Sequence, residues 1–167
     1  MSTLVRLATL EDASAISHLA VATFSMACPV STPADDIKDY IETNLNVECF
    51  ENLLTSSNKK IHVLEFDDQI IGYSLLTLAP EPVGISKADG ITELTRCYLL
   101  AEFHGAGYAQ KLVSETLQSV SGGVRLLVNE ENERAIKFYT RQGFTPVGET
   151  SFYVGKDKHL DLVMINF

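Results

Sequence analysis

Residues 91–113, ITELTRCYLLAEFHGAGYAQKLV, decide the fold. A β-rich apolar run ends at Leu100, a short polar link follows, and the small residues Gly105, Gly107 and Ala109 then open a helix. Small residues let backbone N–H groups crowd together at a helix start, where the helix dipole amounts to about half a positive charge. The stretch therefore predicts a strand, a loop and a helix, with a phosphate or pyrophosphate at the head of the helix.

Other interpretations of this loop are a tight turn that binds nothing and a dinucleotide-binding turn. The dinucleotide fingerprint needs glycine or alanine at its last position, where this chain has Gln110. Glu130, at the end of the next predicted strand, imitates the acid that binds ribose in that fingerprint. The GxxxxGK[ST] pattern of a P-loop is absent from the sequence.

The composition is that of an ordinary globular protein, with 46% hydrophobic and 21% charged residues. A length of 167 residues fits one domain, which we expect to span residues 1–167. The net charge of −9 makes nucleic acid an unfavourable partner and favours cationic ligands such as amines.

The cysteines Cys28, Cys49 and Cys97 are far apart in the sequence, and no CxxC spacing occurs. We therefore expect no disulfides, a reducing compartment and no metal site, since the histidines are equally scattered. The sequence has neither the pattern of a signal peptide nor an apolar run near the ~20 residues that a membrane span requires. The predicted location is cytoplasmic, with no membrane association.

Hydrophobic periodicity predicts alternating strands and helices along the chain. Strands are expected at 3–8, 61–66, 70–78, 91–100, 124–128, 144–154 and 160–167, and helices after Thr9, after Pro33, at 48–55, at 109–120 and between Asn132 and Gly143. This order predicts an α/β (mixed α+β) fold. Its sheet should be mixed and mostly antiparallel, with helices on both faces and one β-α-β crossover.

A second motif, VNEENERAIKFYTRQGF at 128–144, follows the next predicted strand directly. With the first motif it resembles the GCN5-related N-acetyltransferases, which carry [RQ]xxGxG/A at a helix start and AxxxYxxxGF further on. Gly107 and Ala109 match the first pattern, and Asn132, Ala135, Tyr139, Gly143 and Phe144 match the second. The resemblance extends over the whole chain and implies that the crossover binds acetyl-CoA as co-substrate.

The resemblance also implies which residues hold the cofactor. The pyrophosphate would lie on the backbone N–H groups of Gly105, Ala106, Gly107, Tyr108 and Ala109. The pantetheine arm would run along the strand 91–100, beside Cys97, Tyr98 and Leu99, like an added strand. Because Leu94 and Leu99 have opposite parity, we expect a β-bulge in this strand.

Direct acetyl transfer to an amine needs an oxyanion donor, an acid and a base. The resemblance implies that the backbone N–H of Leu99 stabilises the oxyanion and that Tyr139 protonates the CoA thiolate. Glu93 is the candidate base, acting directly or through water. The alternative interpretations are a core aromatic residue for Tyr139 and a solvated strand residue for Glu93.

His104 and Asn132 complete the predicted cofactor site. His104 stands at the position where the family usually has glutamine or arginine. It can still donate a hydrogen bond to the pyrophosphate, but its positive charge is less assured than that of arginine. Asn132 contacts the pantetheine or the thiol, or else only caps the last helix.

The acceptor is expected to be a small primary amine. The segment SFYVGKDKHLDLVM at 151–164, with ATFSMA and IIGYSLL, resembles the bacterial polyamine (spermidine/spermine) branch, which suits the acidic charge. The alternatives are a protein or peptide α-amine acetyltransferase and a non-catalytic acyl-CoA-binding domain. The resemblance leaves a homodimer open.

Overall fold

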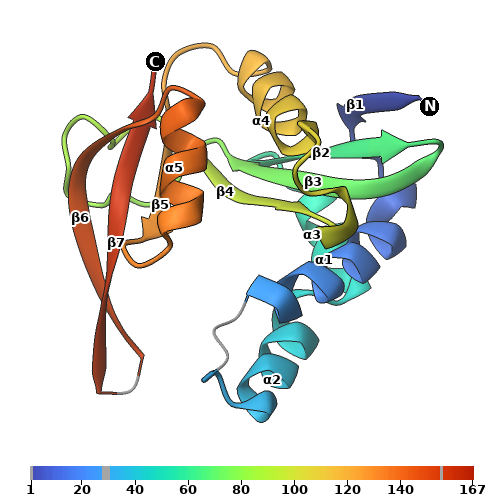
Figure 1. Cartoon of the computed structure of the whole chain (residues 1–167), viewed down its shortest axis with the longest axis horizontal. Helices are drawn as coiled ribbons and strands as arrows, with labels where there is room; N and C mark the ends of the chain where they lie inside the picture. Colours follow the sequence, from blue (N-terminus) through green and yellow to red (C-terminus); the bar gives the residue numbers. More distant parts are fainter. Residues whose placement is uncertain (1, 28–30, 155) are drawn as a thin grey trace.

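The computed structural model describes residues 2–27, 31–154 and 156–167, so Cys28 lies outside the described part. The strands are β1 (Thr3–Leu7), β2 (Lys59–Phe66), β3 (Gln69–Thr77), β4 (Thr92–Leu99), β5 (Val124–Asn129), β6 (Thr145–Val154) and β7 (Asp157–Asn166). The helices are α1 (Ala13–Ala27), α2 (Ala34–Asn44), α3 (Val47–Thr55), α4 (Tyr108–Gln118) and α5 (Glu133–Arg141), with short 3-10 turns at Leu10–Asp12 and Ala101–Phe103. Figure 1 shows their arrangement.

The strands form one sheet in the order β1-β2-β3-β4-β5-β7-β6. Among the strands that the structure describes, only the β4–β5 pair is parallel, and it joins Thr92 to Val124 and Glu93 to Arg125 before the two strands diverge. A parallel pair needs a crossover connection, which α4 supplies. The predicted fold class is therefore confirmed.

The helices cover both faces of the sheet (Figure 1). On one face, α1 and α3 pack on β2 and β3 around Ile16, Phe50 and Tyr73. On the other face, α4 packs on β2, β3 and β4, and the residues of α5 join a core around Leu94 and Phe144. We call these two sides the α1/α3 face and the α4/α5 face.

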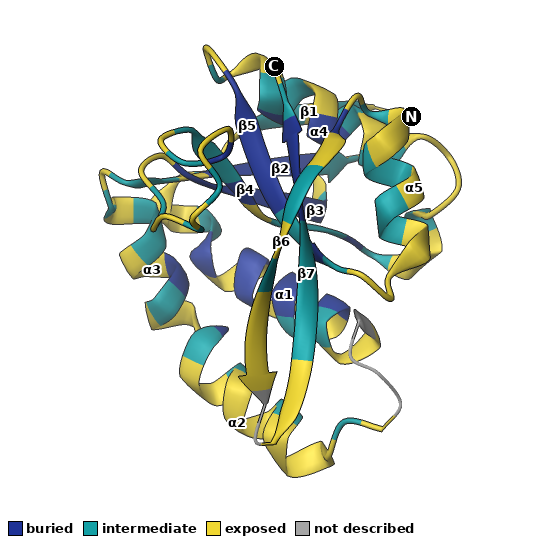
Figure 2. Cartoon of the chain, turned by 90° about the vertical axis from the view of Figure 1, so that its left-hand side faces the viewer, coloured by how far each residue is buried: buried dark blue, intermediate teal, exposed yellow. Residues whose placement is uncertain are grey.

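Over β5, β7 and β6 the α1/α3 face is covered by a loop instead of a helix. Residues of the loop 78–91, among them Val83, Ile85 and Ala88, pack against Val163 and Ile165 of β7. Beyond this cover the β6–β7 hairpin extends away from the rest of the sheet (Figure 1), and Asp157 and Lys158 near its far end are exposed (Figure 2).

The last strand begins at Asp157, earlier than the predicted residue 160. The ladder between β6 and β7 continues to the pair Val154↔Asp157. Asp157 and Lys158 are exposed polar residues, so no apolar alternation marks the extension in the sequence.

The expected bulge lies at Thr95 of β4. Leu76 pairs with Leu94 and the adjacent Leu75 pairs with Arg96, which leaves Thr95 without a partner residue on β3. The bulge reverses the alternation of side chains, so that Leu94 and Cys97 both reach the core of the α4/α5 face.

Candidate functional site

A cavity of about 730 Å³ lies between the end of β4, the loop before α4 and the start of α5. It is lined by Thr23, Met26, Cys97, Tyr98, Leu99, Ala101, His104, Gly105, Gly107, Ala109, Gln110, Leu112, Asn132, Arg134, Ala135, Phe138, Tyr139, Arg141 and Gln142. Most of the predicted cofactor residues are therefore brought together on one surface. Glu93 does not line this cavity.

The loop before α4 depends on two glycines with a left-handed backbone. Gly105 has φ +83° and Gly107, which caps α4, has φ +85°. A Cβ atom on either residue would meet nothing within 4 Å, so the backbone there faces open space. This leaves the N–H groups at the helix start accessible to an anion.

The side chain of Tyr108 packs away from the cavity. Its ring packs edge-on against Phe66 and Phe103, with ring centroids 5.8 Å and 5.9 Å apart. Ala106 is exposed and, like Tyr108, does not line the cavity.

His104 is held between two partners. Its Nε2 lies 2.9 Å from the carbonyl oxygen of Leu99, and its Nδ1 lies 3.3 Å from Nη2 of Arg134. A carbonyl only accepts and a guanidinium only donates. His104 therefore carries its proton on Nε2 and donates a hydrogen bond to the carbonyl of Leu99, while its Nδ1 accepts from Arg134. The positive charge beside the glycine loop therefore comes from Arg134, which the sequence analysis did not single out.

The N–H of Leu99 points toward the edge of β4 where β5 has diverged. The next N–H along the strand, that of Leu100, donates to the carbonyl of Ile71 on β3 at 2.9 Å. Successive N–H groups of a strand point to opposite edges, so that of Leu99 faces away from β3. The described β4–β5 ladder ends at Glu93, which leaves this edge open.

Tyr139 of α5 reaches the same cavity, where its hydroxyl interacts with the thiol of Cys97. Burial raises the pKa of Tyr139 well above 10, and the nearby Cys97 adds to this effect. Burial also raises the pKa of Cys97 to about 12. Both groups therefore keep their protons at neutral pH, and the arrangement presents a protonated hydroxyl close to a sulfur.

Asn132 caps α5, because its Oδ1 accepts a hydrogen bond from the N–H of Ala135 at 3.1 Å. It also lines the cavity. The cap thus fixes the start of the helix that carries Arg134 and Tyr139.

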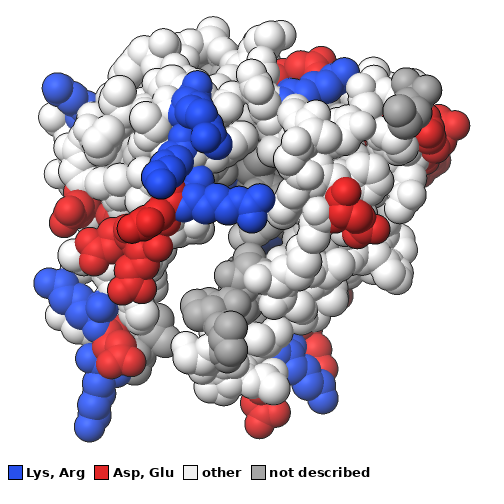
Figure 3. Space-filling model, viewed as in Figure 1, with Lys and Arg blue, Asp and Glu red and all other residues white. Residues whose placement is uncertain are grey.

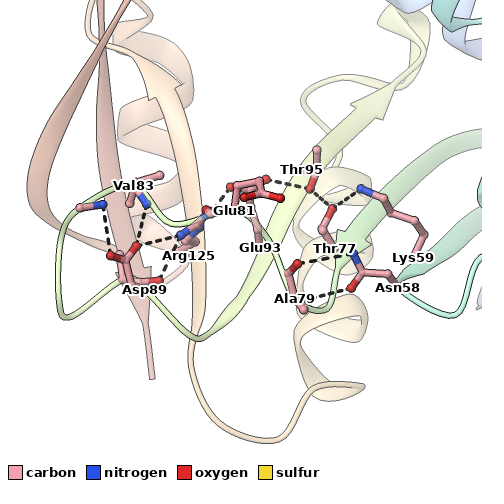
Figure 4. Close-up of polar contacts among 12 residues, drawn as sticks. Asn58, Lys59, Thr77, Ala79, Glu81, Val83, Asp89, Glu93, Thr95 and Arg125 are labelled. Atoms are coloured by element: carbon pink, nitrogen blue, oxygen red, sulfur yellow. Dashed lines mark hydrogen bonds and ion pairs between the residues drawn. The ribbon is translucent and has the colours of Figure 1, made fainter.

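Glu93 lines a separate hollow of about 400 Å³ next to the loop 79–83. One carboxylate oxygen lies 3.1 Å from Nε of Arg125, and the other accepts a hydrogen bond from Thr95 at 3.0 Å (Figure 4). Neither Tyr139 nor Cys97 lines this hollow, so Glu93 and Tyr139 occupy different cavities.

Arg125 is the centre of the polar network around Glu93. Its side chain is 2% exposed, pairs with both Glu93 and Asp89, and donates to the carbonyls of Glu81 and Ala88. Figure 4 shows that these partners come from β4 and from the loop that follows β3. The network attaches this loop to β5.

Several residues that line the cavity were not predicted from the sequence. Arg134 and Arg141 lie seven residues apart on α5, a spacing that could have marked one face of a basic helix. Lys and Arg side chains gather over α5 in Figure 3, above a hollow bordered by the β6–β7 hairpin. Thr23 and Met26 of α1 reach the cavity only because α1 folds back onto the sheet.

The described residues contain neither a cluster of metal ligands nor a helix suited to cross a membrane. Within 2–27, 31–154 and 156–167 there is no group of three or more His, Cys, Asp or Glu residues able to hold a metal ion. In the same segments no helix has both the length and the apolar character to cross a membrane.

A protein-family model described as the acetyltransferase (GNAT) family matches residues 17–144. The chain belongs to this family. It is therefore an N-acetyltransferase of the GNAT type, with acetyl-CoA as its co-substrate.

An uncharacterized N-acetyltransferase of Mycobacterium tuberculosis is 32% identical over 158 residues, covering 92% of this chain and 96% of the relative. A shorter match, 25% identical over 134 residues, is to an uncharacterized N-acetyltransferase of Lactobacillus delbrueckii and covers 78% and 77% of the two chains.

Solved structures share the fold at low identity. PaiA N-acetyltransferase from Thermoplasma acidophilum, in complex with coenzyme A, has a TM-score of 0.77 at 19% identity and covers 99% of both chains. NAA60 of Arabidopsis thaliana with acetyl-CoA has a TM-score of 0.69 at 19% identity, covering 99% and 98%. The names of these relatives state no polyamine substrate, so that part of the sequence interpretation stays a prediction.

Proposed function

We propose that this N-acetyltransferase transfers the acetyl group of acetyl-CoA directly to a small primary amine, with Tyr139 as the general acid. The observation that carries the proposal is the meeting of three groups at one cavity. The Tyr139 hydroxyl beside Cys97, the outward N–H of Leu99 and the glycine-rich start of α4 all border it.

In this proposal the pyrophosphate of acetyl-CoA lies on the N–H groups of residues 105–109. Arg134, which already contacts His104, supplies a cation for it. The pantetheine arm runs along the open edge of β4 beyond Glu93. His104 has a supporting role, because its donor is used by the carbonyl of Leu99.

The chemical step forms one bond and breaks another. The amine nitrogen attacks the thioester carbon, the N–H of Leu99 stabilises the developing oxyanion, and the C–S bond then breaks. The thiolate takes the proton of the Tyr139 hydroxyl, and the tyrosine recovers a proton from solvent. The hydrogen bond between this hydroxyl and the sulfur of Cys97 supports the role of Tyr139 as the acid, because the sulfur of the CoA thiolate would accept from the same hydroxyl.

Glu93 is retained as the proton acceptor, acting through water rather than by direct contact. Both of its oxygens already have partners, Arg125 and Thr95, and it lines the other hollow. Glu93→Gln should then lower kcat about 10-fold or more near pH 7, with recovery toward pH 10, where an alkyl amine loses its proton unaided. A purely structural role would instead lower stability without this recovery.

Release of the CoA thiol, measured over a panel of amino acids, peptides, aminoglycosides and polyamines, tests the proposed function. We expect turnover with one class of primary amine and a large loss in Tyr139→Phe. A protein that binds acetyl-CoA but acetylates no amine would contradict the proposal and support an acyl-CoA-binding domain.

Among small primary amines, polyamines are the candidate acceptors that the charge of the chain favours. The net charge of −9 and the exposed acids Asp35, Asp39 and Glu42 of α2 favour a polycationic substrate. The same panel distinguishes this candidate from the others.

A further inference from the structure

Arg96 lies on β4 directly before Cys97 but on the opposite face of the strand. Cys97 packs into the core beneath α5, whereas Tyr98 packs into the core beneath α1 and α3. The guanidinium carbon of Arg96 lies over the ring of Phe50 in α3, 5.9 Å from its centroid. Arg96 therefore shares the α1/α3 face with Tyr98, as the alternation of side chains along a strand requires.

The guanidinium of Arg96 is surrounded by aromatic residues. It donates a hydrogen bond to the hydroxyl of Tyr73, whose pKa is raised by burial and lowered again in part by the cation of Arg96. Tyr98 and Tyr40 are close to the same hydroxyl. The surroundings thus contribute rings and hydroxyl groups, but no described negative charge.

Arg96 has no ion pair with any of the described residues, unlike the other arginines that lie in the sheet. Arg6 contacts Asp12 and Glu65, and Arg125 contacts Asp89 and Glu93. Nη1 of Arg96 is buried and has no hydrogen-bond partner among residues 2–27, 31–154 and 156–167. A buried charged donor without an acceptor is unfavourable, which points to a ligand that completes it.

Arg96 directly precedes two residues of the cavity, Cys97 and Tyr98, although it does not line the cavity itself. Tyr98 lines the cavity that holds Cys97 and Tyr139, and the cavity extends to Thr23 on α1, the side on which Arg96 lies. Arg96 precedes Leu99 by three residues, a separation on the order of 10 Å along a strand. A small molecule with its amine at the reaction centre can span this distance.

We propose that Arg96 binds a carboxylate of the acceptor, so that the amine acetylated by this enzyme belongs to a small amino-acid-type molecule. The inference rests on the proposed acetyl transfer. A guanidinium and a carboxylate form paired N–H···O bonds, and the ligand oxygens would supply the acceptor that Nη1 lacks. A polyamine would bring a second cation toward Arg96, which electrostatic repulsion disfavours.

The test compares matched acceptors in the wild-type enzyme. A series of ω-amino acids of increasing length, with glycine and other α-amino acids, is assayed against the corresponding amino amides and α,ω-diamines by CoA release. We expect the best amino acid to exceed its neutral amide by about 10- to 100-fold in kcat/KM, as for a hydrogen bond to a charged group.

Substitutions of Arg96 then assign the preference to this side chain. Arg96→Gln should raise KM for the amino acid until it equals the KM for the amide. Arg96→Lys should keep only part of the preference, because an ammonium lacks the planar fork. Arg6→Gln, which removes an arginine with other partners on β1, should leave the preference intact.

The outcomes separate this inference from the proposed function. If amides or diamines match the amino acids, or if Arg96→Gln keeps the preference, the role of Arg96 is overturned while acetyl transfer stands. If acetyl-CoA binds and no amine is acetylated, the proposed function fails and the inference fails with it. If Arg96→Gln does not fold, as judged by urea unfolding, the wild-type comparison and Arg96→Lys decide.

Discussion

The two faces of β4 differ in how their functional residues are assembled. On the α4/α5 face, Cys97 meets Tyr139, and both belong to sequence motifs that follow one another along the chain. On the α1/α3 face, Glu93 and Arg96 meet partners from distant segments, such as Arg125 and Phe50. The residues proposed for the cofactor therefore belong to short sequence motifs, whereas those proposed for the acceptor side match no motif, although both sides are assembled by tertiary packing.

The largest effect is expected for the buried ion pairs that hold the acceptor side together. Arg125→Met leaves Glu93 and Asp89 without their cation, and we expect the free energy of unfolding to fall by about 3–5 kcal/mol. Urea denaturation at neutral pH measures this loss.

The matched control is Arg6→Met. The Arg6 side chain is 31% exposed, against 2% for Arg125, so its two ion pairs should be worth about 1 kcal/mol. Equal losses in the two variants would show that burial does not distinguish these networks.

On the cofactor side, Tyr139→Phe should lower kcat by about 100-fold or more, because the leaving thiolate loses its proton donor. The dissociation constant of acetyl-CoA should change little, which calorimetry can check. Since burial raises the pKa of Tyr139 well above 10, the wild-type rate should show no loss from its ionisation up to about pH 10. Tyr153→Phe, at an exposed tyrosine of the β6–β7 hairpin, is the matched control and should keep the wild-type kcat. An unchanged kcat in Tyr139→Phe would show that Tyr139 is not the acid.

Gly107→Ala tests the loop itself. The left-handed backbone at φ +85° should cost about 1–2 kcal/mol of stability for an L-residue, and the new methyl group would occupy the space predicted for the pyrophosphate. Gly90 has the same φ and the same open surroundings but lies away from the cavity. Gly90→Ala should therefore lose similar stability and keep its affinity for acetyl-CoA; a loss of affinity in both variants would contradict the site.

The smallest effect concerns Asp161 on β7, whose pKa is raised by burial and lowered in part by His159. A raised pKa means that ionisation is less favourable in the folded state, so this carboxylate reduces stability above its folded pKa. Asp161→Asn should increase the free energy of unfolding near pH 7 by up to about 0.5 kcal/mol, and the difference should vanish below about pH 4. A difference that is independent of pH would show that the charge is not responsible.

The cofactor half was predictable because its residues form short contiguous patterns. The glycines before α4 and the Asn132–Tyr139 spacing within one helix are local requirements that appear directly in the sequence. The opposite parity of Leu94 and Leu99 likewise predicted a bulge in this strand, and the structure confirms it and places it at Thr95.

The half proposed for the acceptor was less predictable because its polar residues belong to no short sequence motif. Glu93 was predicted to be a base or a solvated residue, and no local pattern indicated its ion pair with Arg125, 32 residues away. Arg125 in a buried strand was itself a signal that a partner exists, but the sequence does not say which acid provides it. His104 likewise received its partners from Leu99 and Arg134 only in the folded chain.

The sequence by itself determined the fold class, the family and the position of the glycine loop before α4, because hydrophobic periodicity and glycine conformation are properties of neighbouring residues. Only the tertiary structure decided which charges are neutralised, because an ion pair depends on where the strands bring two side chains. On the same face of β4, Glu93 acquired a cation, whereas no described acid reaches Arg96.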